Sequence, residues 1–340
     1  MQTTLSVIIP GYNTPEAWWQ RCVDSVKRAL GPDDEIILVD DGSSDGAKFL
    51  DAWGCKVIHK QNGGLASARN VGAAVAQGEF VTFVDSDDEV LPEAFSRCLK
   101  KLSEVSGDVC IYGVRTVWCE DGLQKIDVSD DRTYGKLMAQ DVYDLSKRCL
   151  MNYACNKVYR AAFLRSHMIE FDLDGMPCED IIYNLACVMA GARWCSVDYA
   201  GYVYYRTRGT LLSKYKRSGF VGIRHGAEAW QRFASTCGEI ASEKVRQWLL
   251  SKSTLTEDSL AHMEWKNIWM PASPYTLAGR WKWMQGHPSV GGVATYLKMA
   301  IYVFLRRHFY WRPVRRWNIR RMYPYATEWR SGIEVSPILQ

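Results

Sequence analysis

The sequence predicts an α/β protein with a mostly parallel sheet, an antiparallel part further along the chain and a helical region at the C-terminus. Three observations carry this prediction. Over the first hundred residues, short apolar runs alternate with helix-like segments, a spacing typical of parallel strands joined by right-handed crossovers. An Asp-Gly pair at 121–122 then predicts a turn into an antiparallel neighbour. From about residue 219 the composition is helical and rich in Trp, without strand signals.

The first strand and helix follow from local signals. Leu5 to Pro10 is a short apolar run that ends at a proline, and it predicts a buried strand. Thr14 supplies an N-cap and Pro15 the first helical position, so a helix is expected from there to about Leu30. Further apolar runs predict buried strands at 35–40, 56–59 and 80–84.

The later elements are assigned in the same way. The Ala-rich segment 65–77 predicts a helix that ends before Gly78, a residue suited to the C′ position. The other elements predicted from their residue patterns are helices over 92–105 and 179–189 and strands over 109–118 and 197–207.

Length and composition describe a folded protein with more than one lobe. The 340 residues exceed one ordinary compact core, and 47% hydrophobic with 24% charged residues is normal for a globular chain. The net charge of +4 is uneven, because residues 295–330 hold nine Lys or Arg and one acid. That segment carries +8, which leaves −4 for the remainder, so the basic character belongs to one tail.

Cysteines and apolar runs indicate the compartment. The eleven cysteines include no C-x-x-C pair, and Cys22, Cys98, Cys110 and Cys187 lie in apolar or helical patterns. They are expected to be reduced and buried in a cytoplasmic protein. The N-terminus lacks the basic region and cleavage site of a secretion signal. The longest apolar stretch in the tail has seven residues, far below the roughly 20 that span a bilayer, so no transmembrane helix is expected.

Three acids follow the predicted strand at 80–84, in the sequence Asp85-Ser86-Asp87-Asp88. The carboxyl end of such a strand lies at the mouth of an open α/β sheet, where ligands bind. Carboxylates this close repel one another and are stable in water or around a cation, for which Mg²⁺ or Mn²⁺ is best suited. A solvated turn before the next helix is the simpler alternative for this motif alone.

Loops after the first two strands, at 10–13 and 40–45, are expected to face the same crevice. A carboxylate in the second loop could accept the imide N–H of a uracil ring, and Tyr12 could cover the ring face. Gly63-Gly64 opens a helix whose free N–H groups favour an anion, and Arg69 could fork onto a phosphate. Taken singly, these loops are ordinary turns, and Arg69 could equally be a surface ion-pair partner.

Together the motifs have a family likeness. The segments SVIIPGYN, IILVDDGSSD, QNGGLASARN and FVTFVDSDD closely resemble the family 2 glycosyltransferases with the GT-A fold. This resemblance covers about residues 5–92 and continues more weakly to about 215. The weaker motifs are CNKVYRAAFL, CEDIIY and GYVYYRTRGTLLS.

The resemblance implies roles for particular residues. Asp87 would ligate a divalent metal, Mn²⁺ or Mg²⁺, on the donor diphosphate, and Asp180 of the Glu-Asp pair would act as general base. The stretch 206–213 is similar to a segment that closes over the diphosphate. The residues implied to hold the nucleoside, ribose, diphosphate and sugar of a nucleotide-sugar donor are Pro10, Tyr12, Asp41, Gly64, Arg69, Asp85 and Ser86.

The resemblance also implies an organisation and a reaction. Residues 1–105 would form the nucleotide-sugar-binding half of the GT-A domain, 106–215 the acceptor-binding and catalytic half, and 216–340 a C-terminal helical region with a basic amphipathic tail. The expected activity is an inverting transfer from a UDP-sugar to a hydroxyl of a glycan or lipid-linked glycan in bacterial cell-surface polysaccharide synthesis. Without the Q/R-x-x-R-W motif of processive synthases, a single addition is favoured.

Two other classes compete with this interpretation. Sugar-nucleotide pyrophosphorylases share a related fold, but they open with a Gly-rich loop that PGYN does not match. A catalytically inactive transferase-like subunit could bind a nucleotide sugar or act as a scaffold. The intact acids Asp85, Asp87 and Asp180 argue against that alternative.

The tail presents one apolar helical stripe over 297–309 and then a cluster of Arg, Trp and Tyr up to about 325. Such a cluster suits an anionic membrane surface, which predicts peripheral attachment through residues 295–325 on the inner face of the membrane. The alternative is a helix docked on the second lobe with solvated arginines. A nucleic-acid partner is not expected.

Overall fold

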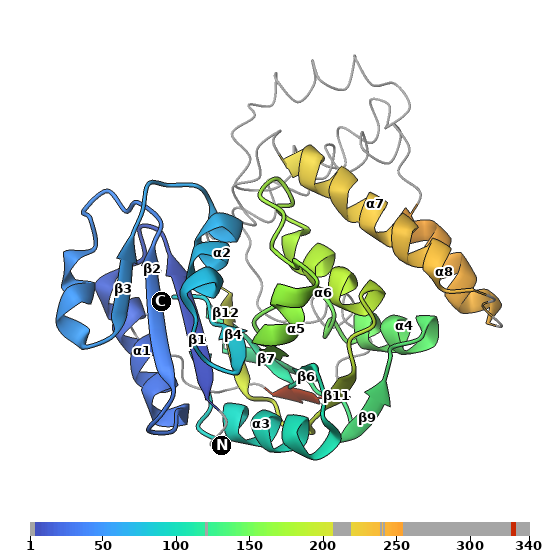
Figure 1. The fold of residues 1–340 in the computed structure, drawn as a ribbon, viewed down its shortest axis with the longest axis horizontal. Helices are drawn as coiled ribbons and strands as arrows, with labels where there is room; N and C mark the ends of the chain where they lie inside the picture. The colour runs from blue at the N-terminus through green and yellow to red at the C-terminus, as the bar shows by residue number, and fades with distance from the viewer. Residues whose placement is uncertain are drawn as a thin grey trace.

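The computed structural model describes residues 4–119, 122–206, 219–238, 240, 242–253 and 328–330. A mixed eight-stranded sheet forms the centre of the molecule (Figure 1). Its strand order is β3-β2-β1-β4-β10-β6-β11-β9. The parallel strands of one half are β1 (Leu5–Gly11), β2 (Glu35–Asp40), β3 (Lys56–His59) and β4 (Phe80–Phe83).

The other half of this sheet changes direction, as expected. Strand β10 runs antiparallel to both β4 and β6, β11 runs parallel to β6, and β9 closes the edge antiparallel to β11. Strands from before residue 105 and from after residue 106 therefore belong to one sheet, which spans the boundary predicted between the two halves of the domain. The strands of this half are β6 (Val109–Ile111), β9 (Arg132–Gly135), β10 (Lys157–Arg160) and β11 (Trp194–Ser196).

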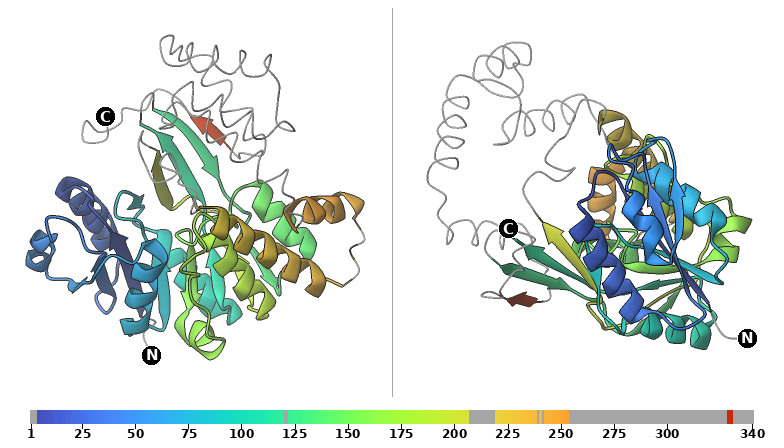
Figure 2. Two further views of the ribbon diagram at one scale, coloured as in Figure 1. Left: turned by 90° about the horizontal axis from the view of Figure 1, so that it is seen from above. Right: turned by 90° about the vertical axis from the view of Figure 1, so that its left-hand side faces the viewer.

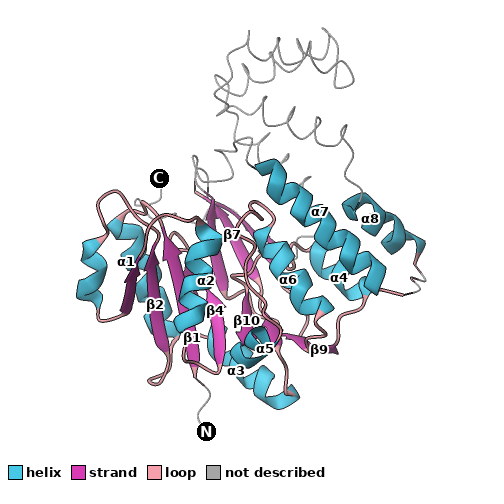
Figure 3. Cartoon of the chain, turned by 45° about the horizontal axis from the view of Figure 1, so that its top comes forward, coloured by secondary structure: helices cyan, strands magenta, loops and turns pink. Residues whose placement is uncertain are grey.

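Helices cover both faces of the sheet because its strands are apolar on both sides. In β1, Val7 and Ile9 pack with α1 and α3, whereas Ile8 faces the opposite layer with α2 and α6. Helix α7 lies on α6 and contacts α8, which also contacts α4 (Figure 3). The α-helices are α1 (Glu16–Ala29), α2 (Leu65–Val75), α3 (Ala94–Val105), α4 (Ala139–Lys147), α5 (Ala161–Ser166), α6 (Glu179–Met189), α7 (Gly219–Thr236) and α8 (Glu243–Ser253), and a 3₁₀ helix, η1, spans Lys48–Trp53.

A second, five-stranded sheet has the order β13-β8-β7-β12-β5 (Figure 2). The predicted antiparallel turn near 121–122 is confirmed, because β7 and β8 pair antiparallel on either side of it. The strands of this sheet are β5 (Glu89–Val90), β7 (Val114–Trp118), β8 (Leu123–Asp127), β12 (Tyr202–Arg206) and β13 (Glu328–Arg330).

Several predicted elements agree with the structure residue for residue. The strands at 35–40 and 56–59 and the helix at 179–189 have the predicted bounds. The predicted strand at 109–118 is wrong, because it is two strands in different sheets. Gly113 lies at the crossing, where a Cβ would lie 2.4 Å from Val128 Cγ1 and 2.6 Å from the Asp127 carbonyl oxygen.

The predicted helix signals also need correction. Pro15, not Thr14, is the N-cap of α1, and the Thr14 hydroxyl instead bonds the Ser86 hydroxyl at 2.8 Å. Helix α2 ends at Val75, so Gly78 is not its C′ residue. Gly78 is needed for close packing, since a Cβ there would lie 2.7 Å from the Ser6 nitrogen.

Two further differences concern strands. The strand predicted at 197–207 begins only at Tyr202, because the preceding amides bond within a turn and to β6. A strand at 328–330 carried no signal in the sequence, yet it pairs antiparallel with β8. The apolar stripe predicted at 297–309 lies outside the described residues. In the part of the chain that the structure describes, no helix is long and apolar enough to cross a membrane.

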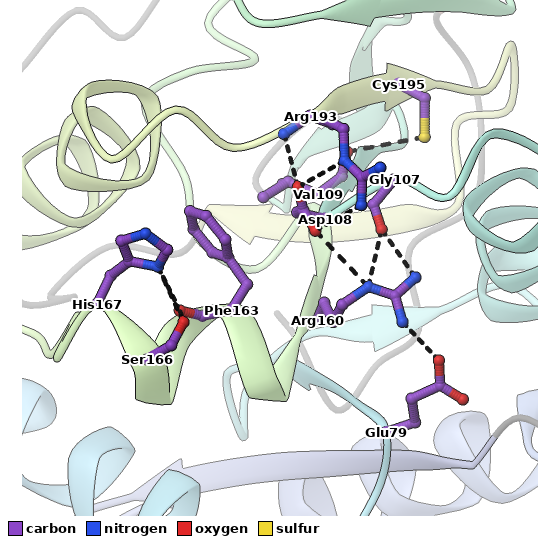
Figure 4. Close-up of polar contacts among 10 residues, drawn as sticks. All are labelled: Glu79, Gly107, Asp108, Val109, Arg160, Phe163, Ser166, His167, Arg193 and Cys195. Carbon is purple, nitrogen blue, oxygen red and sulfur yellow. Dashed lines mark hydrogen bonds and ion pairs between the residues drawn. The ribbon is translucent and has the colours of Figure 1, made fainter.

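A polar cluster fixes the edge of the sheet at which β4 begins (Figure 4). Arg160, which pairs with Phe80 at the start of β4, donates from Nε and Nη2 to the Gly107 carbonyl at 3.1 and 2.9 Å. Its Nη1 lies 2.6 Å from Glu79 Oε1, and Asp108 accepts the Arg193 amide at 2.9 Å. The acids at 85–88 follow β4 at its other end. The polar cluster therefore stabilises the sheet at the end opposite to these acids.

Candidate active site

The loops after β1 and β2 are joined to each other, as predicted. The Asp41 amide donates to the Gly11 carbonyl at 2.9 Å. Asn13, in the left-handed region with φ of 51°, accepts the Ser44 amide on its Oδ1 at 2.8 Å, and its own amide donates to the Ser43 hydroxyl at 2.9 Å. These bonds hold the two loops together at the carboxyl end of the parallel strands.

Asp41 fixes the start of α2. Its Oδ1 accepts the Gly63 amide at 3.0 Å, its Oδ2 accepts the Gly64 amide at 2.7 Å, and Lys60 pairs with the same carboxylate. Gly64 has φ of +86°, which favours glycine, and α2 begins at the next residue. Asp41 is buried, so its predicted contact with a uracil imide stays a prediction, while the structure gives it a role in shaping the Gly-Gly turn.

The other nucleoside residues differ in exposure. Pro10 is buried within β1, whereas the Tyr12 side chain is 53% exposed at the tip of the joined loops. An exposed aromatic ring suits stacking on a base. The roles predicted for Pro10 and Tyr12 stay predictions.

The acid loop after β4 is held from several sides. Ser86 is buried against Thr14. Asp88 is also buried, and its carboxylate accepts the Tyr202 hydroxyl at 2.7 Å and the Tyr205 amide at 2.9 Å. Burial and the neighbouring acids raise the pKa of Asp88 well above its usual range. Asp88 therefore ties the acid loop to β12, a role that the motif alone did not reveal.

Asp85 and Asp87 are less buried than Ser86 and Asp88. The Asp85 amide donates to the Tyr202 hydroxyl at 3.1 Å, and the Arg21 guanidinium of α1 bonds the Asp87 carbonyl. Burial, and then the charge of Asp85, raise the pKa of Asp87 to about 6. Two carboxylates that disfavour each other's charge in this way form a set that a cation would stabilise.

Arg69 connects the acid loop with α6. This side chain is 1% exposed, and its Nη2 lies 2.8 Å from Asp85 Oδ1 while its Nη1 lies 2.6 Å from Asp180 Oδ1. Its guanidinium carbon lies 5.1 Å from the centroid of the Phe171 ring. Both terminal nitrogens bond carboxylates, and the contact of Arg69 with a donor phosphate stays a prediction. Arg69 brings Asp85 and Asp180 to one place.

The acid pair at the start of α6 has two different environments. Asp180 Oδ2 accepts the Ala154 amide at 3.0 Å, so both of its oxygens have donors. Glu179 is buried, and its Oε2 has no hydrogen-bond partner among the described residues. Burial, and then the charge of Asp180, raise the pKa of Glu179 to about 7. The sequence analysis assigned no role to Glu179. Its position next to Asp180 in the sequence was the signal that could have pointed to it.

A divalent cation fits the acid loop chemically. The described residues contain no group of three His, Cys, Asp or Glu side chains that could hold a metal. Mg²⁺ and similar ions are commonly bound by one or two carboxylates together with substrate phosphates, and Asp85 and Asp87 offer that donor set.

This geometry defines a class of protein: an α/β domain with joined loops and a bridged carboxylate cluster at the carboxyl end of its parallel strands. Solved structures of *Staphylococcus aureus* TarS share the fold. TarS 1–349 in complex with UDP-GlcNAc superimposes with a TM-score of 0.58 at 21% identity, covering 80% of this chain and 82% of that one. The fold is therefore the expected GT-A fold.

Part of the chain matches a known sequence family. Residues 6–166 match the family model "Glycosyl transferase family 2". Glycosyltransferase EpsJ of *Bacillus subtilis* is 30% identical over 226 residues, covering 61% of this chain and 62% of that protein. Glycosyltransferase GlyG of *Streptococcus pneumoniae* is 34% identical over 161 residues, covering 45% and 50%. The chain thus spans about half to three fifths of the length of these curated relatives.

Proposed function

We propose that this chain is a glycosyltransferase that moves a sugar from a UDP-sugar to a hydroxyl of a glycan or lipid-linked glycan in cell-surface polysaccharide synthesis. The observation that carries the proposal is the Arg69 bridge, which places Asp180 of α6 beside Asp85 of the acid loop. A donor-binding loop and a proton acceptor are thus adjacent. A related protein, TarS, is described as a poly(ribitol-phosphate) β-N-acetylglucosaminyltransferase and is 28% identical over 212 residues.

The reaction needs a proton acceptor and a stabilised leaving group. We assign Asp180 as the general base: its carboxylate takes the proton of the acceptor hydroxyl as that oxygen bonds the anomeric carbon. The bond from that carbon to the donor diphosphate breaks, and the diphosphate leaves with the electron pair. Arg69 and the Ala154 amide orient Asp180. The proposed attack of the acceptor oxygen is direct, without a covalent enzyme intermediate, so the anomeric configuration would invert.

Asp87, with Asp85 beside it, would hold Mn²⁺ or Mg²⁺ on the diphosphate. Such an ion, when bound, neutralises charge that develops on the leaving diphosphate. The chain itself contributes the N-terminus of α2, which begins after Gly64, and the exposed Tyr12 ring to donor binding. Ser86 contributes by anchoring the acid loop to the first loop through Thr14.

The test measures UDP release from a panel of UDP-sugars with Mn²⁺, beginning with UDP-GlcNAc. In Asp87→Ala, binding of the donor should no longer stabilise the folded protein in a metal-dependent way. Asp180→Asn should retain donor binding and lower turnover by about 100-fold or more. Asp33→Asn is the matched control, because Asp33 is exposed beside the other end of the strands. An inactive scaffold would bind donor with no metal-dependent turnover in any variant, and that result would reject the proposal.

We further propose that the protein works at the cytoplasmic face of the membrane, attached through residues 295–325. Support comes from the sequence of that segment, with its Arg, Trp and Tyr cluster. The cysteines that lie in apolar or helical sequence patterns, Cys22, Cys98, Cys110 and Cys187, are buried free thiols, which suits a reducing compartment. Full-length protein should float with anionic liposomes, and changing Arg315, Arg316, Arg320 and Arg321 to Gln should abolish flotation. Equal flotation of both proteins would reject membrane attachment by this cluster.

A further inference from the structure

A buried polar network stands behind Asp180, and the proposed mechanism does not use it. Lys157 and Asn156 at β10 and Asn184 of α6 are 0% exposed, and Tyr159 is also fully buried. Four such groups are costly to bury unless each finds partners. Their partners lie mainly in one short segment, residues 150–154, which has no regular secondary structure beyond turns.

The network takes up almost every carbonyl of that segment. Lys157 Nζ donates to the Leu150 carbonyl at 2.7 Å and to the Tyr153 carbonyl at 2.5 Å. A third partner of the same nitrogen is Asn156 Oδ1, at 2.7 Å. The three acceptors match the three N–H donors of the charged Lys157 amine, although burial lowers its pKa to about 7.

Asn184 and Tyr159 complete the network from the neighbouring elements. Asn184 Nδ2 donates to the Met151 carbonyl at 2.9 Å and to the Tyr153 carbonyl at 3.1 Å. The Tyr159 hydroxyl donates to Asn184 Oδ1 at 2.8 Å and lies 3.3 Å from the Ala154 carbonyl. Four of the five carbonyls between 150 and 154 are therefore directed into the core.

One amide of the segment is directed the other way. The Ala154 N–H donates to Asp180 Oδ2 at 3.0 Å, on the oxygen that Arg69 does not bond. Because the carbonyls are held by rigid core elements, the position of this amide is fixed relative to α6. Removing a donor from the network frees the carbonyls and lets the amide move away from the carboxylate.

We propose that Lys157, Tyr159 and Asn184 form a clamp on residues 150–154 that positions the Ala154 amide on Asp180. These are positioning residues, since none of them bonds Asp180 itself. The inference deepens the proposed function, because the positioned carboxylate is the assigned base. The sequence motif CNKVYR thereby gains a role. Its Asn156 and Lys157 side chains contact residues 150–154, and its Arg160 belongs to the polar cluster at the end of the sheet where β4 begins.

The test compares Tyr159→Phe and Lys157→Met with wild type. Tyr159→Phe removes one hydroxyl, whereas Lys157→Met removes three donors and carries a greater risk of misfolding. Thr82→Val is the matched control, because the buried Thr82 hydroxyl donates to the Lys157 carbonyl at 2.7 Å without touching residues 150–154. Thermal unfolding establishes that each variant is folded.

Two measurements decide the outcome. In Tyr159→Phe, amide hydrogen exchange in residues 150–156 should quicken about tenfold. The kcat of UDP release from UDP-GlcNAc should fall about tenfold, with the Kd for UDP within about twofold of wild type. Lys157→Met should show larger changes of the same kind, and Thr82→Val neither.

Unchanged exchange in both variants would overturn the clamp. Faster exchange with unchanged kcat would overturn its positioning role and leave a purely structural network. A parallel loss of UDP affinity and kcat would do the same, because a clamp on Asp180 affects turnover and not nucleotide binding. A wild-type protein that releases no UDP contradicts the proposed function and not the clamp, which the exchange rates decide on their own.

Discussion

Replacing Glu179 by Gln should stabilise the protein increasingly as the pH rises. The pKa of this buried carboxyl is raised from 4.5 to about 7, by burial first and then by the charge of Asp180. The folded state therefore binds more protons than the unfolded chain between these values, so its stability falls as pH rises through them. At about 1.4 kcal/mol per pKa unit, the ionised carboxylate costs the folded state about 3 kcal/mol above pH 7.

The pH dependence, not the absolute stability, is the quantity to measure. Gln keeps the shape of Glu but leaves a buried amide, a cost that does not vary with pH. The free energy of unfolding of Glu179→Gln minus that of wild type should therefore grow by about 2 to 3 kcal/mol between pH 5 and pH 8. Urea titrations at both pH values test this, with Glu104→Gln as the exposed control. A difference that is constant, or that shrinks toward pH 8, would refute the reasoning.

Three further predictions follow from other contacts. Lysine in Arg69→Lys lacks the guanidinium fork and cannot bridge two carboxylates. The free energy of unfolding should therefore fall by about 3 kcal/mol in a urea titration, and UDP release should be lost in the release assay. Gly222→Ala would place a Cβ 2.0 Å from the Met176 carbonyl oxygen, so α7 should separate from the segment before α6, with a loss of about 2 kcal/mol and lower turnover. The pKa of His59 is raised first by its hydrogen bond to Asp40, so this pair stabilises the fold at pH 5.5 and the contribution is lost as pH rises. Because the His59 side chain is 36% exposed, His59→Gln should cost less than about 1 kcal/mol at pH 5.5 and nothing at pH 8.5 in the same titration.

Local sequence signals were sufficient where local interactions decide the structure. The strands at 35–40 and 56–59 consist of short apolar or β-branched runs, and the helix at 179–189 has an acidic start and an apolar interior. The gathering of the loops after β1, β2 and β4 also followed from strand direction alone. These features depend on residues close together in the chain or on the rule that parallel strands end at one edge.

The remaining features depend on partners far away in the sequence. Arg69 and Asp180 are separated by 111 positions, and no local pattern indicates that the guanidinium bridges two carboxylates. The pairing of Asp88 with Tyr202 spans 114 positions. The break at Gly113 is set by the Asp127 carbonyl, the Val128 side chain and the Ala200 backbone, which approach too closely for a side chain at 113. Tertiary contacts of this kind override the apolar pattern that joined 109–118 into one strand.

The pairing of β13 with β8 has a practical consequence for shortened versions of this protein. Residues 328–330 bond to 124–126, so a chain cut anywhere upstream of 328 leaves the backbone groups of β8 without that neighbour. A bare strand edge is a template for intermolecular pairing, and such fragments should form aggregates or dimers as concentration increases. Expression of the catalytic region alone would therefore benefit from a lysine or proline introduced on β8, or from a linked copy of the closing strand.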